Sequence, residues 1–137
     1  MTPEQKALVK TSFEKVVPIS DLAAALFYNR LFELDPSLRT LFLSDLKEQG
    51  RKLMTMLKMV VNGLDRIEFL LPAVDALGQR HARYRVPESS YDTVGEALLW
   101  TLAQGLGDAF THEVEAAWVA AYRLLAGVMK EGALKVA

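Results

Sequence analysis

The stretch that decides the fold is Leu77-Gly78-Gln79-Arg80-His81-Ala82-Arg83-Tyr84. Apolar residues precede its histidine at helical spacing, at Leu70, Val74 and Leu77, so the histidine closes the apolar stripe of a predicted helix. A buried imidazole needs either a hydrogen-bond partner or a metal. The spacing alone leaves both interpretations open, and a core histidine satisfied by a hydrogen bond is the commoner case.

The composition limits what the chain can be. Its 137 residues suit one compact domain, which we expect to span residues 1–137. The formal net charge of -1, from 16 basic and 17 acidic residues, argues against a nucleic-acid partner and against an anionic membrane surface. Cysteine is absent, which excludes disulfides, thiolate metal sites and covalent haem attachment. The sequence contains neither a signal-peptide core nor an apolar run of membrane-spanning length, so a cytoplasmic location is expected.

Helix signals run along the whole sequence. Thr2-Pro3-Glu4-Gln5 is a capping box that opens a first helix, and Asp35-Pro36 caps and starts a short helical turn. Pro72 is predicted to open the helix that carries His81. Alternating β-branched runs are missing, so the fold class is all-α, with about seven helices including short ones. The proline breaks give helices of unequal length, which favours an orthogonal packing over an up-down bundle.

Few constellations in the sequence could carry chemistry. Nucleophile triads, phosphate loops and zinc signatures are absent, and His112 beside Glu113 is interpreted as a solvated surface residue. One inward imidazole is too few for a metal held by protein ligands alone, but it is enough for a metal whose other ligands come from a macrocycle, as in haem. Tyr28 and Gln49 could then donate hydrogen bonds across the haem, and Phe42 could pack on the ring. The aliphatic residues expected to line such a pocket are Leu53, Leu57, Leu77, Val86, Val94 and Leu98.

Four segments together resemble a known family, in order and over essentially the whole chain. They are Phe27-Tyr28-Asn29-Arg30-Leu31-Phe32-Glu33-Leu34-Asp35-Pro36 followed by Leu41-Phe42, then Gln49-Gly50-Arg51-Lys52-Leu53-Met54, then Leu77-Gly78-Gln79-Arg80-His81 with Tyr91-x-x-Val94-Gly95-x-x-Leu98-Leu99, and finally Ala117-Trp118-x-x-Ala121-Tyr122. The chain resembles a single-domain bacterial haemoglobin, similar to the globin half of flavohaemoglobins. The resemblance implies a globin fold packed around a haem pocket.

The resemblance also implies roles for particular residues. His81 would be the proximal iron ligand of a non-covalently bound haem b, with Tyr91 behind it. Tyr28 and Gln49 would be the distal pair. Three further residues would complete the site: Phe42 packed on the haem, Leu53 over the gas ligand, and Arg80 near a propionate.

The proximal side departs from the flavohaemoglobin pattern. That family pairs the tyrosine equivalent to Tyr91 with a carboxylate near the end of the last helix, and the matching position here is Ala133. Glu131 is two residues away, about half a helical turn. The resemblance therefore implies a weaker electronic push on the proximal imidazole, less suited to peroxide chemistry but compatible with oxygen binding.

Two functions follow from the resemblance. The first is reversible, high-affinity dioxygen binding for transport or storage, in which two distal donors stabilise the partial negative charge of the bound ligand. The alternative is nitric oxide dioxygenation for nitric oxide detoxification, with electrons from a separate reductase. A gas-sensor domain fits less well because no output domain follows the last helix, and a haem-free interaction module would not need His81, Phe42, Tyr28 and Gln49 together. Dioxygen, nitric oxide and carbon monoxide are the expected ligands, and the expected state is a monomer or weak homodimer.

Overall fold

Helices form nearly all of the structure. A computed structural model describes residues 1–42, 45–83 and 86–136. Helices account for 90% of this described part, and none of it forms a strand. The prediction of an all-α fold is confirmed. Tyr84, the last residue of the stretch around His81, lies outside the described residues.

The described residues form six α-helices joined in part by four short 3₁₀ helices, close to the seven helices expected. In chain order they are α1 (Pro3–Val16), η1 (Val17–Ile19), α2 (Ser20–Leu34), η2 (Pro36–Leu41), α3 (Leu46–Gly63), η3 (Leu64–Arg66), α4 (Ile67–Arg83), α5 (Ser90–Leu106), η4 (Gly107–Ala109) and α6 (His112–Leu134).

Two predicted helix starts are confirmed. The Thr2 hydroxyl accepts a hydrogen bond from the backbone N–H of Gln5 at 3.1 Å, and the Gln5 side chain accepts one from the backbone N–H of Thr2 at 3.0 Å. Asp35 caps η2 by accepting from the backbone N–H of Ser37 at 3.1 Å. In both places a proline occupies the first helical turn, where a missing N–H costs nothing.

The predicted role of Pro72 is wrong. Helix α4 begins at Ile67, and Pro72 lies inside it rather than at its start. Leu70 and Val74, on either side of the proline, are 4% and 1% exposed, so one apolar stripe passes across it. Burial of this stripe offsets the loss of one backbone hydrogen bond on an exposed part of the helix.

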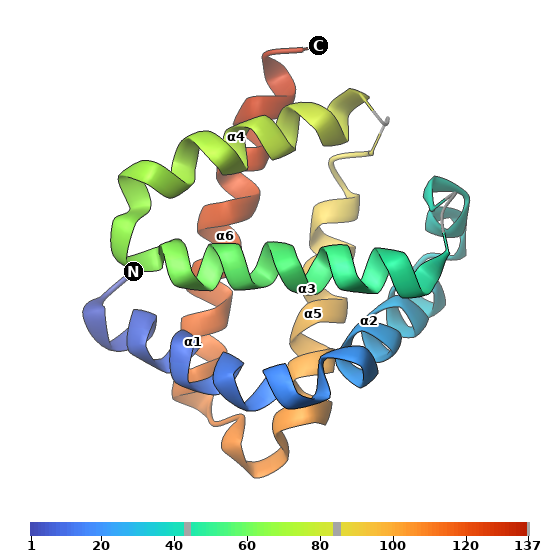
Figure 1. Cartoon of the computed structure of the whole chain (residues 1–137). Helices are drawn as coiled ribbons and strands as arrows, with labels where there is room; N and C mark the ends of the chain where they lie inside the picture. The colour runs from blue at the N-terminus through green and yellow to red at the C-terminus, as the bar shows by residue number, and fades with distance from the viewer. Residues whose placement is uncertain (43–44, 84–85, 137) are drawn as a thin grey trace.

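The helices cross one another rather than forming a parallel bundle. In Figure 1, α3 and α4 run across the direction of α5 and α6, and α6 passes behind α4 and α1. The most extensive packing is between α4 and α6, followed by α2 against α5, α1 against α6 and α2 against α3. The direct contact between α3 and α4 is small by comparison. This orthogonal packing agrees with the expectation from helix length.

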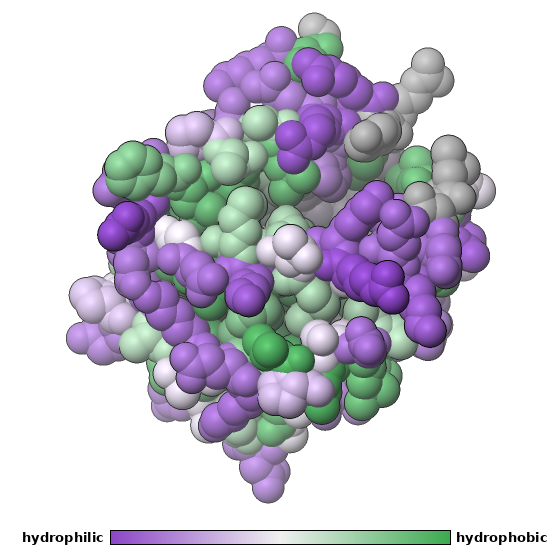
Figure 2. Space-filling view, viewed as in Figure 1, coloured by the Kyte–Doolittle hydropathy of each residue, from purple (hydrophilic) through white to green (hydrophobic). Residues whose placement is uncertain are grey.

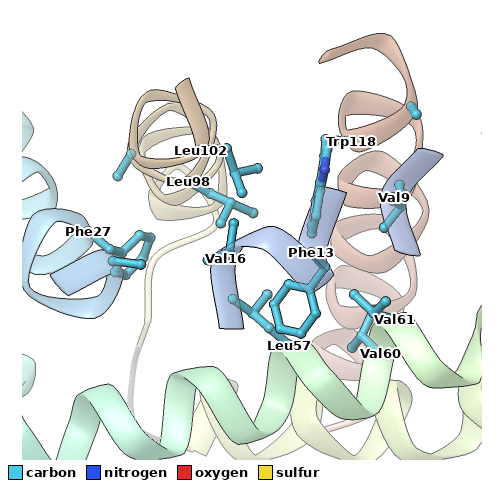
Figure 3. Close-up of a cluster of buried hydrophobic side chains, with 14 of the residues drawn as sticks. Val9, Phe13, Val16, Phe27, Leu57, Val60, Val61, Leu98, Leu102 and Trp118 are labelled. Atoms are coloured by element: carbon cyan, nitrogen blue, oxygen red, sulfur yellow. The ribbon is translucent and has the colours of Figure 1, made fainter. Parts of the chain in front are cut away.

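A continuous hydrophobic core fills the space between the crossing helices (Figure 3). Phe13 of α1 and Trp118 of α6 lie with ring centroids 6.3 Å apart. The indole Nε1 of Trp118 donates a hydrogen bond to the Ser12 hydroxyl at 2.8 Å, so this buried polar group is satisfied. Around them pack the apolar residues Val9, Val16, Phe27, Leu57, Val60, Val61, Leu98 and Leu102.

Candidate functional site

An apolar cavity of about 130 Å³ lies among α3, α4, α5 and α6. Figure 2 shows hydrophobic atoms among polar ones on the face formed by α3 and α4. Apart from Ser90, His81 and two tyrosines, every residue that lines the cavity is apolar. A polar ligand would find little to bind there, whereas the lining matches an apolar group that carries one coordinating atom.

His81 lines this cavity from the last turn of α4. Its Nδ1 lies 2.8 Å from the backbone carbonyl oxygen of Leu77, one helical turn earlier. Burial lowers the pKa of the imidazole, and the charge of Arg80 lowers it further, while the Leu77 carbonyl acts in the opposite direction. A neutral ring whose Nδ1–H donates to a carbonyl keeps the lone pair of Nε2 for a metal.

Most of the residues predicted to line the pocket lie on this cavity. Alongside His81 the structure brings together Leu53, Leu57, Leu77, Val86, Tyr91, Val94 and Leu98. They come from three helices and one connection, so the fold gathers residues that the sequence spreads over 46 positions, from 53 to 98.

The predicted distal residues form a second group beside the cavity. The Tyr28 hydroxyl donates a hydrogen bond to the backbone carbonyl of Gln49 at 3.2 Å, and burial raises the tyrosine pKa to about 12. Phe42 packs edge-on against Tyr28, with ring centroids 5.2 Å apart. Tyr28, Gln49 and Phe42 are therefore neighbours, but none of them lines the cavity in this conformation.

The helices that carry the distal pair are held close together. A Cβ on Gly50 of α3 would lie 2.9 Å from the Cβ of Ala24 in α2, closer than side chains normally approach. Gln49 directly precedes this glycine, and Tyr28 lies one turn beyond Ala24. The close approach of the two backbones thus brings the tyrosine hydroxyl within reach of α3.

Arg80 takes no part in the cavity. Its side chain is exposed and does not line the pocket, in contrast to His81, the next residue. This is the placement expected of a residue that meets a polar edge of a bound group, so the propionate role remains a prediction.

On the proximal side, α6 supplies groups that the sequence analysis did not identify. The Tyr122 hydroxyl donates a hydrogen bond to the backbone carbonyl of Tyr91. The Lys130 ammonium lies 5.7 Å from the centre of the Tyr91 ring. Glu131 is exposed and, within the described chain, forms no hydrogen bond or ion pair. The charged group that α6 places beside Tyr91 is thus a cation rather than a carboxylate.

The sequence analysis did not identify several other residues that line the cavity. They are Val9, Phe27, Val60, Val61, Leu64, Val74 and Trp118, all expected only as core residues or not singled out. An apolar residue that faces a cavity and one that faces another side chain have the same helical spacing, so no sequence signal separates them.

The donor set fits a macrocyclic metal better than a bare ion. In residues 1–42, 45–83 and 86–136 no group of three His, Cys, Asp or Glu side chains could hold a metal ion. His81 offers one nitrogen to a largely apolar cavity, and the exposed basic residue Arg80 precedes it in the chain. One such imidazole among packed helices suits a flat, apolar prosthetic group that takes a single ligand from the protein.

Comparison with known proteins identifies the family. The Globin family model matches residues 25–129, so the chain belongs to the globin family. It is 30% identical over 139 residues to a flavohemoprotein of Vibrio cholerae, a match that covers 98% of this chain and 35% of the relative. It is equally 30% identical to a neuroglobin of Danio rerio, over 146 residues that cover 96% of this chain and 92% of the neuroglobin.

The chain spans about a third of the flavohemoproteins it matches, and a second example from Halalkalibacterium halodurans is covered to 32% of its length. Membership of the globin family supports gas binding at a haem, and it confirms the resemblance inferred from the four sequence segments. No helix in the described part of the chain is both long enough and apolar enough to cross a membrane.

Proposed function

We propose that this globin binds dioxygen reversibly at a non-covalently held haem b, with His81 as the proximal ligand. The observation that carries the proposal is the bond between His81 Nδ1 and the Leu77 carbonyl, which leaves Nε2 as the coordinating atom on an apolar cavity. The bound haem supplies a ferrous iron that takes up diatomic gases. The surrounding side chains would exclude water and donate hydrogen bonds to the ligand.

The apolar lining excludes water from the ligand side. Leu53, Leu57 and Val94 present only hydrocarbon to the cavity, and a dry cavity strengthens any hydrogen bond made inside it. Water is also needed for the proton-assisted oxidation that ends reversible binding. The lining therefore supports a carrier that releases dioxygen unchanged.

Tyr28 and Gln49 are the proposed hydrogen-bond donors to the ligand. The Tyr28 hydroxyl is buried and keeps its proton, since burial raises its pKa to about 12. It donates to the Gln49 backbone carbonyl at 3.2 Å, a long bond that a charged acceptor can displace. A side-chain movement that turns the Tyr28 hydroxyl toward the cavity, together with the half-buried Gln49 amide, would provide two donors for a bound gas molecule.

An absorption spectrum of the purified protein with one equivalent of haem tests this proposal. We expect a Soret band that shifts with dioxygen and with carbon monoxide, and that returns to the deoxy position when the gas is removed. Haem that stays as loosely bound as on an unrelated helical protein would contradict the proposal. So would a ferrous form that oxidises at once in air.

The second candidate function is nitric oxide dioxygenation, in which bound dioxygen reacts with nitric oxide to give nitrate. The similarity to two flavohemoproteins favours it, although only about a third of their length is matched. We propose that electrons would then come from a separate reductase. Stopped-flow mixing of the oxygenated protein with nitric oxide, with and without a flavin reductase, distinguishes the two functions. Rapid nitrate formation that becomes catalytic only when the reductase is present would support the nitric oxide dioxygenase function.

A further inference from the structure

We propose that the C-terminal part of α6 sets the position of the proximal histidine, through a reciprocal glycine contact with α4. The inference rests on the proposed haem ligation by His81. It concerns residues that do not line the cavity: Gly78 and Asp75 of α4, and Gly132 and Lys135 near the end of α6. They act as positioning residues for the iron ligand.

The two helices touch backbone to backbone at two places. A Cβ on Gly78 would lie 2.2 Å from the backbone oxygen of Met129 and 2.6 Å from its Cα. A Cβ on Gly132 would lie 2.4 Å from the backbone oxygen of Asp75. Since the atoms in the way belong to helix backbones, they cannot rotate aside as a flexible side chain would. Each helix therefore contributes a glycine that lets the other helix approach.

The two contacts fix the register of α4 on α6. Gly78 faces Met129 and Asp75 faces Gly132, so a step of three residues back along α4 matches a step of three residues forward along α6. Two points of contact, one helical turn apart, define both the distance and the sliding position of an antiparallel pair. This pair also has the most extensive packing in the molecule.

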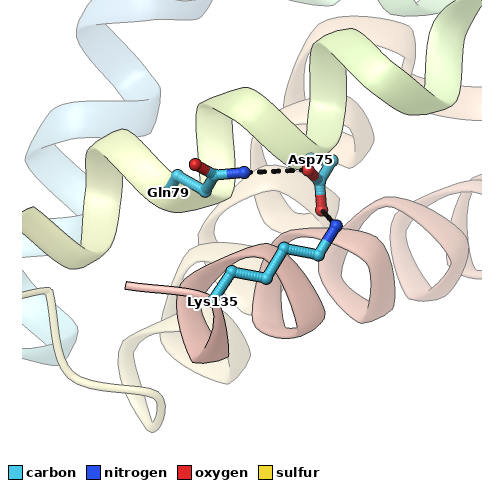
Figure 4. Close-up of polar contacts among 3 residues, drawn as sticks. All are labelled: Asp75, Gln79 and Lys135. Carbon is cyan, nitrogen blue, oxygen red and sulfur yellow. Dashed lines mark hydrogen bonds and ion pairs between the residues drawn. The ribbon is translucent and has the colours of Figure 1, made fainter. Parts of the chain in front are cut away.

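A polar cluster holds the same register from the side (Figure 4). The Asp75 carboxylate accepts from Lys135 Nζ at 3.0 Å and from Gln79 Nε2 at 3.0 Å, and these partners lower its pKa. The Lys135 side chain is 62% exposed, so the ion pair adds little stability. Its geometric role is to tie the end of α6 to the turn of α4 before Gly78.

The contact reaches His81 through one turn of helix. Gly78 lies three residues before His81 and next to Leu77, whose carbonyl orients the imidazole. A helix segment this short moves as a unit, because its backbone hydrogen bonds fix each residue relative to the next turn. Added volume at Gly78 or Gly132 would push α4 from α6 and carry Nε2 of His81 with it.

Three glycine variants of the full chain, each loaded with haem, test the proposal. Gly132→Ala and Gly78→Ala add a methyl group at the contact. Gly127→Ala is the matched control, because it adds the same group to α6 where no atom lies within 4 Å. The readouts are the iron–histidine stretching band in resonance Raman spectra of the ferrous protein and the ferric/ferrous midpoint potential. Both report the iron–imidazole bond rather than stability.

We expect Gly132→Ala and Gly78→Ala to shift the band and the potential, and Gly127→Ala to match the wild type in both. Asp75→Asn, which changes no volume, should shift the band in the same direction by less. It serves as the second variant if a glycine variant does not fold. In the haem-free protein, NMR should show the His81 ring resonances displaced by Gly132→Ala while those of His112 stay in place.

The outcomes separate the two proposals. An iron–histidine band that persists in His81→Ala would overturn the proposed ligation by His81, and this inference with it. A wild-type band that is unchanged in Gly132→Ala, Gly78→Ala and Asp75→Asn would overturn the positioning role alone. In that case the glycines would serve only to let two helices pack.

Discussion

The imidazole of His81 is tied to the carbonyl of Leu77, 2.8 Å away and one turn earlier in the same helix. A carbonyl oxygen has two lone pairs, so the Leu77 carbonyl can accept from the imidazole as well as from the helix backbone. The bond to the imidazole fixes the ring orientation and the tautomer together. Several measurable consequences arise from this arrangement and from the packing around it.

Replacing His81 should abolish firm haem binding. In His81→Ala no other nitrogen or sulfur ligand lines the described cavity except the methionine thioethers of Met56 and Met129. Haem titration followed at the Soret band should give a much weaker affinity, and added imidazole should partly restore the spectrum by entering the vacated space. A variant that keeps the wild-type band and affinity without imidazole would exclude His81 as the ligand. His112→Ala, at an exposed histidine, is the control.

The haem-free protein should lose stability as the pH falls through about 6.5, the ordinary histidine value. Burial lowers the pKa of His81 in the folded state, so below that pH the unfolded chain binds a proton that the folded chain does not. The loss begins at the unfolded-state pKa and levels off below the folded-state pKa. Melting temperatures between pH 7.5 and 5 should show this slope in the wild type and in His112→Ala, and a reduced slope in His81→Leu. Equal slopes in all three proteins would contradict it.

Tyr28→Phe should speed dioxygen release. A hydrogen bond to a charged acceptor contributes about 1.5–3 kcal/mol, which corresponds to roughly ten- to over a hundred-fold in the dissociation rate. Carbon monoxide is the internal control, since it accepts a hydrogen bond poorly and its release should change less. Stopped-flow measurements that find the dioxygen off-rate within a factor of about two of wild type would leave Tyr28 with a packing role only.

Gln49→Leu should act in the same direction as Tyr28→Phe. Both side chains would donate to the same bound gas molecule, so their effects should not add. The bond from Tyr28 to the Gln49 backbone carbonyl stays available in Gln49→Leu. The double variant measured beside the two single variants gives the coupling. Strict additivity would mean that the two side chains reach the ligand independently.

Ser12→Ala should destabilise the fold. The Trp118 indole N–H is buried and donates to Ser12, so the variant leaves a buried donor unpaired at a cost of about 1–3 kcal/mol. Urea unfolding measures the loss, and Ser89→Ala, at an exposed serine, should be close to neutral. A difference of less than about 0.5 kcal/mol between the two variants would mean that water replaces the serine.

The parts of the fold that the sequence predicts well are those set by local chemistry. The Thr2 capping box and the Asp35 cap are contacts between near neighbours in the chain, and both occur as expected. Pro72 was misjudged for the opposite reason. Its local preference for a helix start is outweighed by burial of Leu70 and Val74 against other helices.

In the candidate site too, features set by local sequence were predictable and features set by contacts between distant segments were not. The stripe that ends at His81 marks the cavity wall, because a helix that buries one face must turn that face inward. The cation beside Tyr91 and the glycine contact between α4 and α6 were not visible, since each depends on which residues of two distant segments meet. Lys130 and Gly132 have no local pattern that marks them.

The small area shared by α3 and α4 has a consequence for assembly. Each helix is anchored elsewhere: α3 on α2 by the approach of Gly50 to Ala24, and α4 on α6 by Gly78 and Gly132. The cavity thus lies beside a thinly packed boundary between α3 and α4. Separating these two helices breaks few direct contacts, so we expect a planar guest to enter the folded chain between them while the α2–α3 and α4–α6 pairs stay packed.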